Sequence, residues 1–209
     1  MTKQWDAVYA AKPRWDIGRP QPAFLALAET GAIRGRVLDV GCGTGEHVLM
    51  CAAMGLSATG VDLSTAALRE AEQKAHDRKL TAHFVDLDVR RLRVLDETYD
   101  TVLDSGLFVH VVDDEDALSD FLDGLRSVVV PGGRYFMLSF REHAGHAGHA
   151  SGQGHRAMTP DQIAAVFFDG WRVDSIEPVL IDSTADVDRI PAWLTALTRS
   201  SDPTNRRGG

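Results

Sequence analysis

The chain has 209 residues, 44% of them hydrophobic and 25% charged, a composition that suits one folded domain and argues against disorder. Its formal net charge of -8 disfavours sequence-independent binding to nucleic acid or to an anionic membrane, and the basic cluster Arg90, Arg91 and Arg93 is too short to reverse this. No apolar run approaches the ~20 residues needed to span a bilayer, and the N-terminus lacks an apolar signal segment. Two cysteines make no disulfide framework, so we expect a cytoplasmic protein. The charge and the lack of a long apolar run lead us to expect no nucleic-acid or membrane partner.

Short apolar runs alternate with longer amphipathic runs along the chain, which indicates strands that alternate with helices. The strands are predicted at 37–41, 57–63, 81–87, 99–106, 134–140 and 171–181. The run 192–199 fits a strand or a helix, and a last strand is favoured. The helices are predicted at 44–54, 65–79, 114–129 and 159–168. This order is typical of an α/β fold with a parallel sheet wound on both faces, and such sheets bind ligands at the carboxyl ends of their strands.

Local signals mark the ends of several of these elements. Ser64 and Thr159 stand where N-caps are expected, and Pro160 stands in a first helical turn. A turn is expected at 131–133, where the sequence reads Pro-Gly-Gly. The Gly/His-rich stretch 143–155 is interpreted as a mobile loop, and the tail 200–209 as flexible.

A glycine-rich loop follows the first predicted strand in RVLDVGCGTGEHVLM, residues 36–50. Gly41, Gly43 and Gly45 permit tight turns and let the backbone approach a ligand, and the start of the next helix offers unpaired N–H groups. Asp62 ends the second predicted strand, where an acid is placed to accept both hydroxyls of a ribose. A nucleoside-containing cofactor is therefore expected, against the alternative of an ordinary strand–helix turn.

The spacing and charge of the loop indicate which nucleotide to expect. A dinucleotide loop reads G-x-G-x-x-G and holds a pyrophosphate, whereas this loop is one residue shorter and continues into Glu46. Asp39 lies just before the loop. Carboxylates repel phosphates and suit a cation, so the prediction is S-adenosylmethionine rather than a nicotinamide dinucleotide.

At this point the chain resembles the class I S-adenosylmethionine-dependent methyltransferases. VLDVGCGTG resembles their first motif and the acid at Asp62 their second, and the resemblance is strongest over residues 35–140. WDIGRPQP, VLDSGLF and PAWLTALTR are similar to a small bacterial subgroup related to thiopurine, thiol and halide methyltransferases and to mycobacterial enzymes that methylate heterocyclic or phenolic toxins. The resemblance implies a Rossmann-like, mostly parallel seven-stranded sheet with a last antiparallel strand. It also implies one domain over 1–199 with an N-terminal lid over 1–30.

The resemblance implies a set of cofactor contacts. The glycine loop would border the methionine moiety, Asp62 the ribose hydroxyls and Asp88 the adenine amino group, with Asp86 as the competing acid. Trp15 would fold over the cofactor; the alternative is a hydrophobic anchor outside the site. The implied cofactor-binding residues are Trp15, Asp39, Gly41, Cys42, Gly43, Gly45, Asp62, Leu63, Asp88, Val89, Asp104 and Ser105.

The acceptor side is predicted to be apolar and to favour a flat aromatic molecule. Its pocket residues would be Ile17, Leu107, Phe108, His143 and Arg156. His110 is the candidate catalytic base for an acceptor that is not already ionised, because a histidine titrates near neutral pH; a surface or helix-capping histidine is the alternative.

Two further interpretations concern metal and reactive thiols. The histidines of 143–155 match a zinc spacing in part, but no cysteine or carboxylate is fixed nearby, so no metal is predicted. Cys42 and Cys51 are interpreted as packing residues rather than nucleophiles.

The predicted function is methyl transfer to oxygen, nitrogen or sulfur of a small phenolic or heterocyclic acceptor. A thiol or halide methyltransferase, a nicotinamide-dependent oxidoreductase and a non-catalytic S-adenosylmethionine-binding protein remain alternatives. A monomer and a homodimer both remain open.

Overall fold

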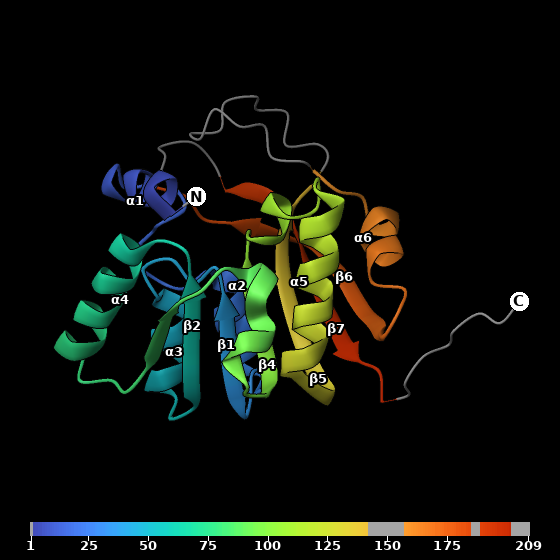
Figure 1. Ribbon diagram of the computed structural model, residues 1–209, viewed down its shortest axis with the longest axis horizontal. Helices are drawn as coiled ribbons and strands as arrows, with labels where there is room; N and C mark the ends of the chain where they lie inside the picture. The colour runs from blue at the N-terminus through green and yellow to red at the C-terminus, as the bar shows by residue number, and fades with distance from the viewer. Residues whose placement is uncertain (1, 142–156, 185–188, 202–209) are drawn as a thin grey trace, which may run out of the picture.

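A computed structural model of the chain describes residues 2–141, 157–184 and 189–201. One mixed sheet of seven strands runs through the molecule in the order β3-β2-β1-β4-β5-β7-β6. The pairs among β1 to β5 are parallel, and β7 is antiparallel to both β5 and β6. Figure 1 shows the sheet between two layers of helices. The Rossmann-like fold expected from the sequence is confirmed, with β7, the last strand in the chain, as its antiparallel member.

The strands match the predicted runs closely. They are β1 Arg36–Val40, β2 Ser57–Asp62, β3 His83–Asp86, β4 Tyr99–Ser105, β5 Val129–Phe140, β6 Trp171–Ile181 and β7 Ile190–Arg199. The helices are α1 Thr2–Ala10, α2 Pro22–Glu29, α3 Glu46–Ala53, α4 Thr65–Asp77, α5 Glu115–Val128 and α6 Pro160–Val166, with the 3-10 segments η1 Val89–Leu95 and η2 Phe108–His110. The helices α1 and α2 and the two 3-10 segments were not predicted individually.

The expected turn at 131–133 is wrong, because β5 already begins at Val129. Val129 pairs with Tyr99 and Arg134 pairs with Thr101, so the extra residues of β5 between these pairs form a bulge. Gly132 takes a φ of 78° there, a conformation that favours glycine. The chain thus joins the sheet at Val129, before the Pro-Gly-Gly segment, and regular pairing resumes at Arg134.

The predicted helix caps at Ser64 and Thr159 are confirmed. The Ser64 hydroxyl accepts a hydrogen bond from the Ala67 N–H, and Thr159 forms a capping box with Gln162. Such caps satisfy backbone donors that the first helical turn leaves unpaired. They fix where α4 and α6 begin relative to the strands before them.

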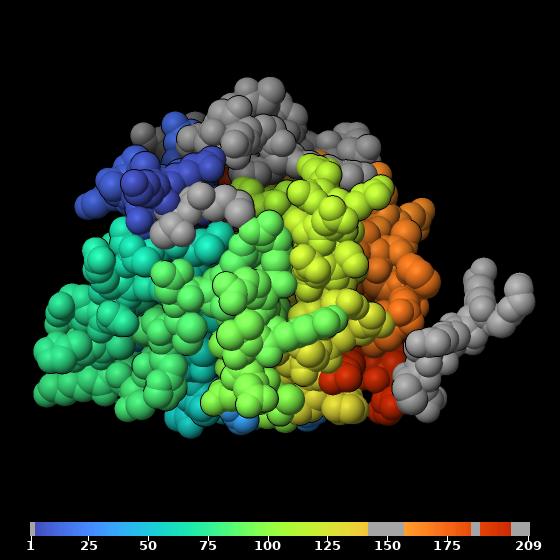
Figure 2. Space-filling view, viewed as in Figure 1, coloured from blue at the N-terminus to red at the C-terminus, as the bar shows by residue number. Residues whose placement is uncertain are grey.

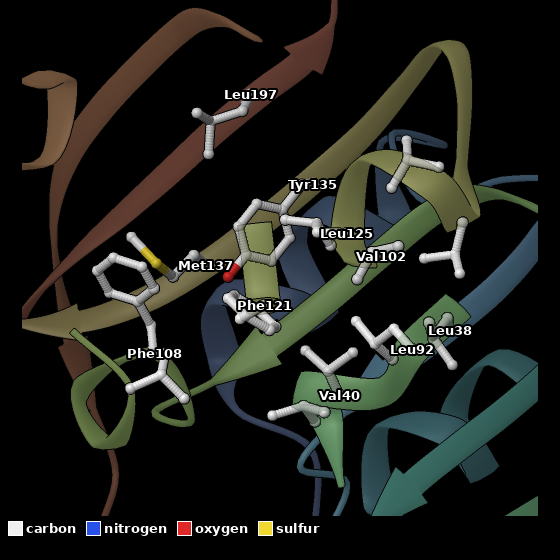
Figure 3. Packing of buried hydrophobic residues seen from close by; sticks show 14 of the residues in the cluster. Leu38, Val40, Leu92, Val102, Phe108, Phe121, Leu125, Tyr135, Met137 and Leu197 are labelled. Carbon is white, nitrogen blue, oxygen red and sulfur yellow. The ribbon is translucent and has the colours of Figure 1, made fainter. Parts of the chain in front are cut away.

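Two apolar layers cover the faces of the sheet. Figure 3 shows the layer beneath η1, α5 and α6, in which Phe108 and Phe121 pack near Tyr135. The opposite layer joins α2 and α3 to the sheet around Phe24 and Val48. Because strand side chains alternate between the faces, each polar residue near a strand end is directed to one layer or the other. In the part of the chain that the structure describes, no helix is both long and apolar enough to cross a bilayer.

Candidate active site

A cavity of about 320 Å³ lies where the parallel strands end. Gly41, Leu63, Leu87 and Ser105 line it, and these residues follow or close β1, β2, β3 and β4 respectively. This volume is in the range of pockets that hold small molecules and cofactors. The position is the one predicted from the alternating pattern of strands and helices.

The glycine loop between β1 and α3 forms one wall of the cavity. Gly41 and Gly43 have φ angles of 68° and 53°, which side chains rarely adopt. A Cβ on Gly41 would lie 3.0 Å from the Leu107 Cβ, and one on Gly43 would lie 2.5 Å from the Tyr9 hydroxyl. The backbone conformation therefore favours glycine at both positions, and the neighbours leave little room for a side chain.

Asp62 joins this loop to the start of α4. Its carboxylate accepts the N–H of Gly43 at 2.8 Å through one oxygen and the N–H of Ser64 at 2.8 Å through the other. Burial raises the pKa of Asp62, and the backbone hydrogen bonds act in the opposite direction. Each carboxylate oxygen keeps accepting capacity for a hydroxyl of a bound ligand.

Leu63, Asp88 and Val89 line a second part of the cavity, together with Arg90. Asp88 caps η1 by accepting the Arg90 N–H at 3.0 Å, and the Arg90 guanidinium also donates to its carboxylate. The hydrogen bonds from Arg90 hold the pKa of Asp88 below its usual value. Asp86, the competing acid, is exposed and does not line the cavity.

The end of β4 carries Ser105 to the cavity, and the turn after it carries Leu107 and His110 there. Asp104 itself is fully buried beneath this turn and accepts hydrogen bonds from the Leu107 N–H and the Tyr135 hydroxyl, both at 2.8 Å. Burial raises the pKa of Asp104 to about 7, and the hydrogen bonds from Tyr135 and the backbone oppose this rise. Asp104 thus stabilises the turn after β4 by accepting hydrogen bonds from its backbone.

The N-terminal segment covers the cavity from the side opposite the sheet. The helix α1 lies above the first turn of α4 (Figure 1), and the space-filling view shows the blue N-terminal residues against the teal surface of α4 (Figure 2). Trp5, Tyr9 and Trp15 line the cavity, and the Trp5 ring meets the His110 ring edge-on with centroids 5.0 Å apart. Sequence reasoning predicted Trp15 here but missed Trp5 and Tyr9.

Comparison with protein families matches residues 37–133 to a methyltransferase domain. A 2-heptyl-1-hydroxyquinolin-4(1H)-one methyltransferase from Mycobacteroides abscessus is 31% identical over 178 residues, which cover 85% of this chain and 76% of the relative. The chain belongs to the class I S-adenosylmethionine-dependent methyltransferases.

Two further relatives support the assignment of this chain to the family. A structure solved in a study of the conversion of a disulfide bond into a thioacetal group during echinomycin biosynthesis is 32% identical, with a TM-score of 0.86 over 98% of this chain and 93% of that chain. A probable thiol methyltransferase 2 from Arabidopsis thaliana is 40% identical over 73 residues, covering 34% of this chain and 31% of the relative. The match therefore spans about a third of that plant protein.

The family uses S-adenosylmethionine, and the cavity fits this cofactor. Magnesium protoporphyrin IX methyltransferase from Synechocystis PCC 6803, crystallised with it, shares the fold with a TM-score of 0.64 and 21% identity over 85% of this chain and 76% of that chain. In the methyltransferase described here, the glycine wall admits close backbone contact and Asp62 offers acceptors for ribose hydroxyls. The cofactor supplies a methyl group activated on a sulfonium sulfur.

The structure brings many of the predicted site residues to the cavity. Those that line it are Trp15, Gly41, Asp62, Leu63, Asp88, Val89, Ser105, Leu107 and His110. Asp39, Cys42, Gly43, Gly45, Asp104, Ile17 and Phe108 are not among its lining residues. His143 and Arg156 lie outside the described residues, as does the Gly/His-rich stretch 143–155. Besides Trp5 and Tyr9, sequence reasoning missed Gln4, Leu87, Arg90, Gly106, Val111, Asp114, Ala117 and Phe140.

Asp39 is directed away from the cavity by strand alternation. Leu38 and Val40 belong to the layer beneath α5, so Asp39 between them faces the α2 and α3 side. There its carboxylate is 1% exposed, 3.6 Å from the Nδ1 of His47, and accepts no hydrogen bond from the described residues. The group that faces this buried carboxylate is therefore His47 on α3, and Asp39 does not act on a ligand in the cavity.

Glu46 does not act on the ligand as the loop sequence suggested. Its carboxylate pairs with Lys74 at 3.1 Å and with Arg78 at 2.8 Å, both on or just after α4. The argument that Glu46 repels phosphates from the loop therefore loses its basis, because two cations neutralise it. The shorter loop spacing remains.

The two cysteines are buried packing residues, as predicted. Burial raises the pKa of Cys51 to about 12 and that of Cys42 well above its ordinary value. A thiol in this state is a poor nucleophile. Among the described residues, no group of three histidine, cysteine or acidic side chains is arranged to hold a metal ion.

Proposed function

We propose that this methyltransferase transfers a methyl group to oxygen, nitrogen or sulfur of a small, flat phenolic or heterocyclic acceptor by in-line displacement. The observation that carries the proposal is the apolar and aromatic character of the cavity beside the turn after β4. Trp5, Leu107 and Phe140 line this part together with Ser105 and Gly106. Such walls suit an aromatic ring and offer few groups that would orient a polar chain.

The chain's own residues act mainly by positioning. Because the cofactor's methyl group is already activated, the enzyme must align the acceptor atom with it, and alignment alone can contribute about 7–11 kcal/mol of barrier reduction. Leu107 and Trp5 would restrict the acceptor's orientation. His110, at the mouth of the cavity beside Trp5, would accept the proton of an acceptor that is not ionised at neutral pH.

The mycobacterial relative supports a heterocyclic acceptor, since its name states that it methylates a hydroxyquinolone. A thiol or halide acceptor is the second candidate, supported by the match to the plant thiol methyltransferase. Asp62, Asp88 and Asp114 line the described cavity, and Arg90 there is paired with Asp88. A cavity with this charge attracts a cationic cofactor and disfavours a free halide or thiolate.

The experiment is a methyl-transfer assay with the purified chain and S-adenosylmethionine labelled in the methyl group. Phenols, hydroxyquinolones, thiols and halides are offered in parallel, and label in each product is counted. The proposal expects label in a phenol or heterocycle. Label only in thiols or halides would establish the second candidate, and no label in any acceptor would refute both.

A further inference from the structure

Tyr9 is a cavity residue of the N-terminal helix to which neither the resemblance nor the family match assigns a role. Its hydroxyl lies against the glycine loop, where a Cβ added to Gly43 would meet it at 2.5 Å. The Trp15 indole N–H donates a hydrogen bond to the phenol oxygen. The phenol proton itself has no acceptor among the described residues.

The environment of the Tyr9 hydroxyl keeps this group protonated, so that it can donate a hydrogen bond. Burial and the nearby negative charge of Asp62 together raise the pKa of Tyr9 well above its ordinary value, so the phenol stays protonated at any physiological pH. Because the indole of Trp15 already donates to the oxygen, the phenol proton is polarised toward a further acceptor. Tyr9 is partly buried and lines the cavity, and a donor in this position gains most when a ligand supplies the acceptor.

The helix α1 is held in the position that places Tyr9 there. The Asp6 carboxylate accepts hydrogen bonds from the Ser64 hydroxyl at 2.8 Å and from the Ala66 N–H at 3.0 Å, at the first turn of α4. Trp5 and Tyr9 are four residues apart on one face of α1, and both reach the cavity. Asp6 therefore docks the helix on α4 while its neighbours close the cavity.

We propose that Tyr9 is a cofactor-binding residue whose hydroxyl donates a hydrogen bond to an oxygen of S-adenosylmethionine, from the ribose or the methionine carboxylate. Asp62 and the glycine loop, which would hold the ribose and the methionine moiety, both lie close to Tyr9. Closing α1 and binding the cofactor are then one event, because the helix supplies a contact that only the ligand completes. The inference rests on the family's cofactor and not on the identity of the acceptor.

The test is calorimetric titration of S-adenosylhomocysteine into the wild-type chain, Tyr9→Phe and Tyr99→Phe. Tyr9→Phe keeps the ring and removes one hydrogen bond, so its Kd is expected to rise about three- to tenfold. Tyr99 is the matched control, because its hydroxyl bonds to Glu97 and does not line the cavity. Tyr99→Phe is expected to bind the cofactor product as the wild type does.

A second ligand shows whether Tyr9 binds the ribose or the carboxylate oxygen. Amide hydrogen exchange shows whether the hydroxyl acts through ligand contact or through the stability of α1. 5′-Methylthioadenosine has the ribose but no carboxylate, so a loss that persists with it assigns the ribose, and a loss that disappears assigns the carboxylate. Ligand binding should also slow amide exchange over 2–10 in the wild type, and less so in Tyr9→Phe.

The possible results distinguish the role of Tyr9 from the cofactor site and from the proposed function. Equal binding of both ligands by Tyr9→Phe and wild type, or an equal loss in Tyr99→Phe, overturns the proposal. A wild-type chain that binds no cofactor product overturns the cofactor site as a whole. A chain that binds it with the expected loss in Tyr9→Phe, yet methylates no acceptor, supports Tyr9 and refutes only the proposed function.

Discussion

Replacing Asp104 with asparagine should flatten the dependence of stability on pH. The pKa of Asp104 rises to about 7 in the folded chain because the carboxyl is fully buried, against an ordinary value of 3.8. A carboxyl whose pKa is raised by folding binds its proton more tightly in the native state. Its contribution to stability is therefore fully present below about pH 4 and is lost as pH rises through about 7.

The magnitude follows from the size of this shift. A difference of about three pKa units corresponds to about 4 kcal/mol over the full range, of which about 2 kcal/mol falls between roughly pH 5.5 and 7.5. Asparagine has the same shape and can still accept the Leu107 N–H, but it does not titrate. The variant should therefore lack this part of the pH dependence.

The assay is urea unfolding of wild type, Asp104→Asn and Asp120→Asn at several pH values across that range. Asp120 is an exposed residue of α5 and controls for the loss of one carboxylate. The difference between wild type and Asp104→Asn should change by about 2 kcal/mol across this range, while Asp120→Asn should follow the wild type. A constant difference between wild type and Asp104→Asn would refute the reasoning.

Three other changes test separate parts of the molecule. Asp6→Asn weakens the docking of α1 on α4, so amide exchange over 2–10 should become faster at unchanged melting temperature; unchanged exchange would argue against Asp6 as the anchor. His110→Gln should lower kcat about a hundredfold for a weakly acidic acceptor and far less for an acidic phenol, as measured by methyl transfer; equal losses would exclude a base role. Gly60→Ala should lower the free energy of unfolding by about 1–3 kcal/mol in urea, because its Cβ would lie 2.7 Å from the Cys42 sulfur; a neutral effect would show that the core yields there.

Most of the sheet could be predicted from the sequence because each strand is a short apolar run with its own boundaries. The loop around Gly41 and Gly43 and the acid at Asp62 could also be predicted, since their geometry depends on neighbours close in sequence. The bulge near Gly132 could not, because Pro-Gly-Gly signals a turn locally, while the pairing of Val129 with Tyr99 that starts β5 before it involves a distant strand.

The residues that sequence reasoning missed depend on contacts between distant segments. The helix α1 is short and only weakly amphipathic, and its docking requires Asp6 to meet the start of α4 some 60 residues later. Tyr9 reaches the cavity only through this docking. One signal was available, since Trp5 and Tyr9 are spaced to share a helical face. The ion-pair partners of Glu46 could likewise not be predicted, because Lys74 lies in α4 and Arg78 caps its C-terminus, about 30 residues away.

The central claim is that S-adenosylmethionine binds at the carboxyl edge of the sheet, with Asp62 holding its ribose. The most direct measurement is calorimetric titration of the cofactor into wild type, Asp62→Asn and Asp86→Ala, with melting temperatures recorded for each. Asp86 is the control, because it pairs in register with Asp62 on the neighbouring strand but is exposed and outside the cavity. The account predicts binding by wild type and Asp86→Ala and an affinity at least about tenfold weaker for a folded Asp62→Asn. Equal affinity of the Asp62 variant and the wild type would contradict it.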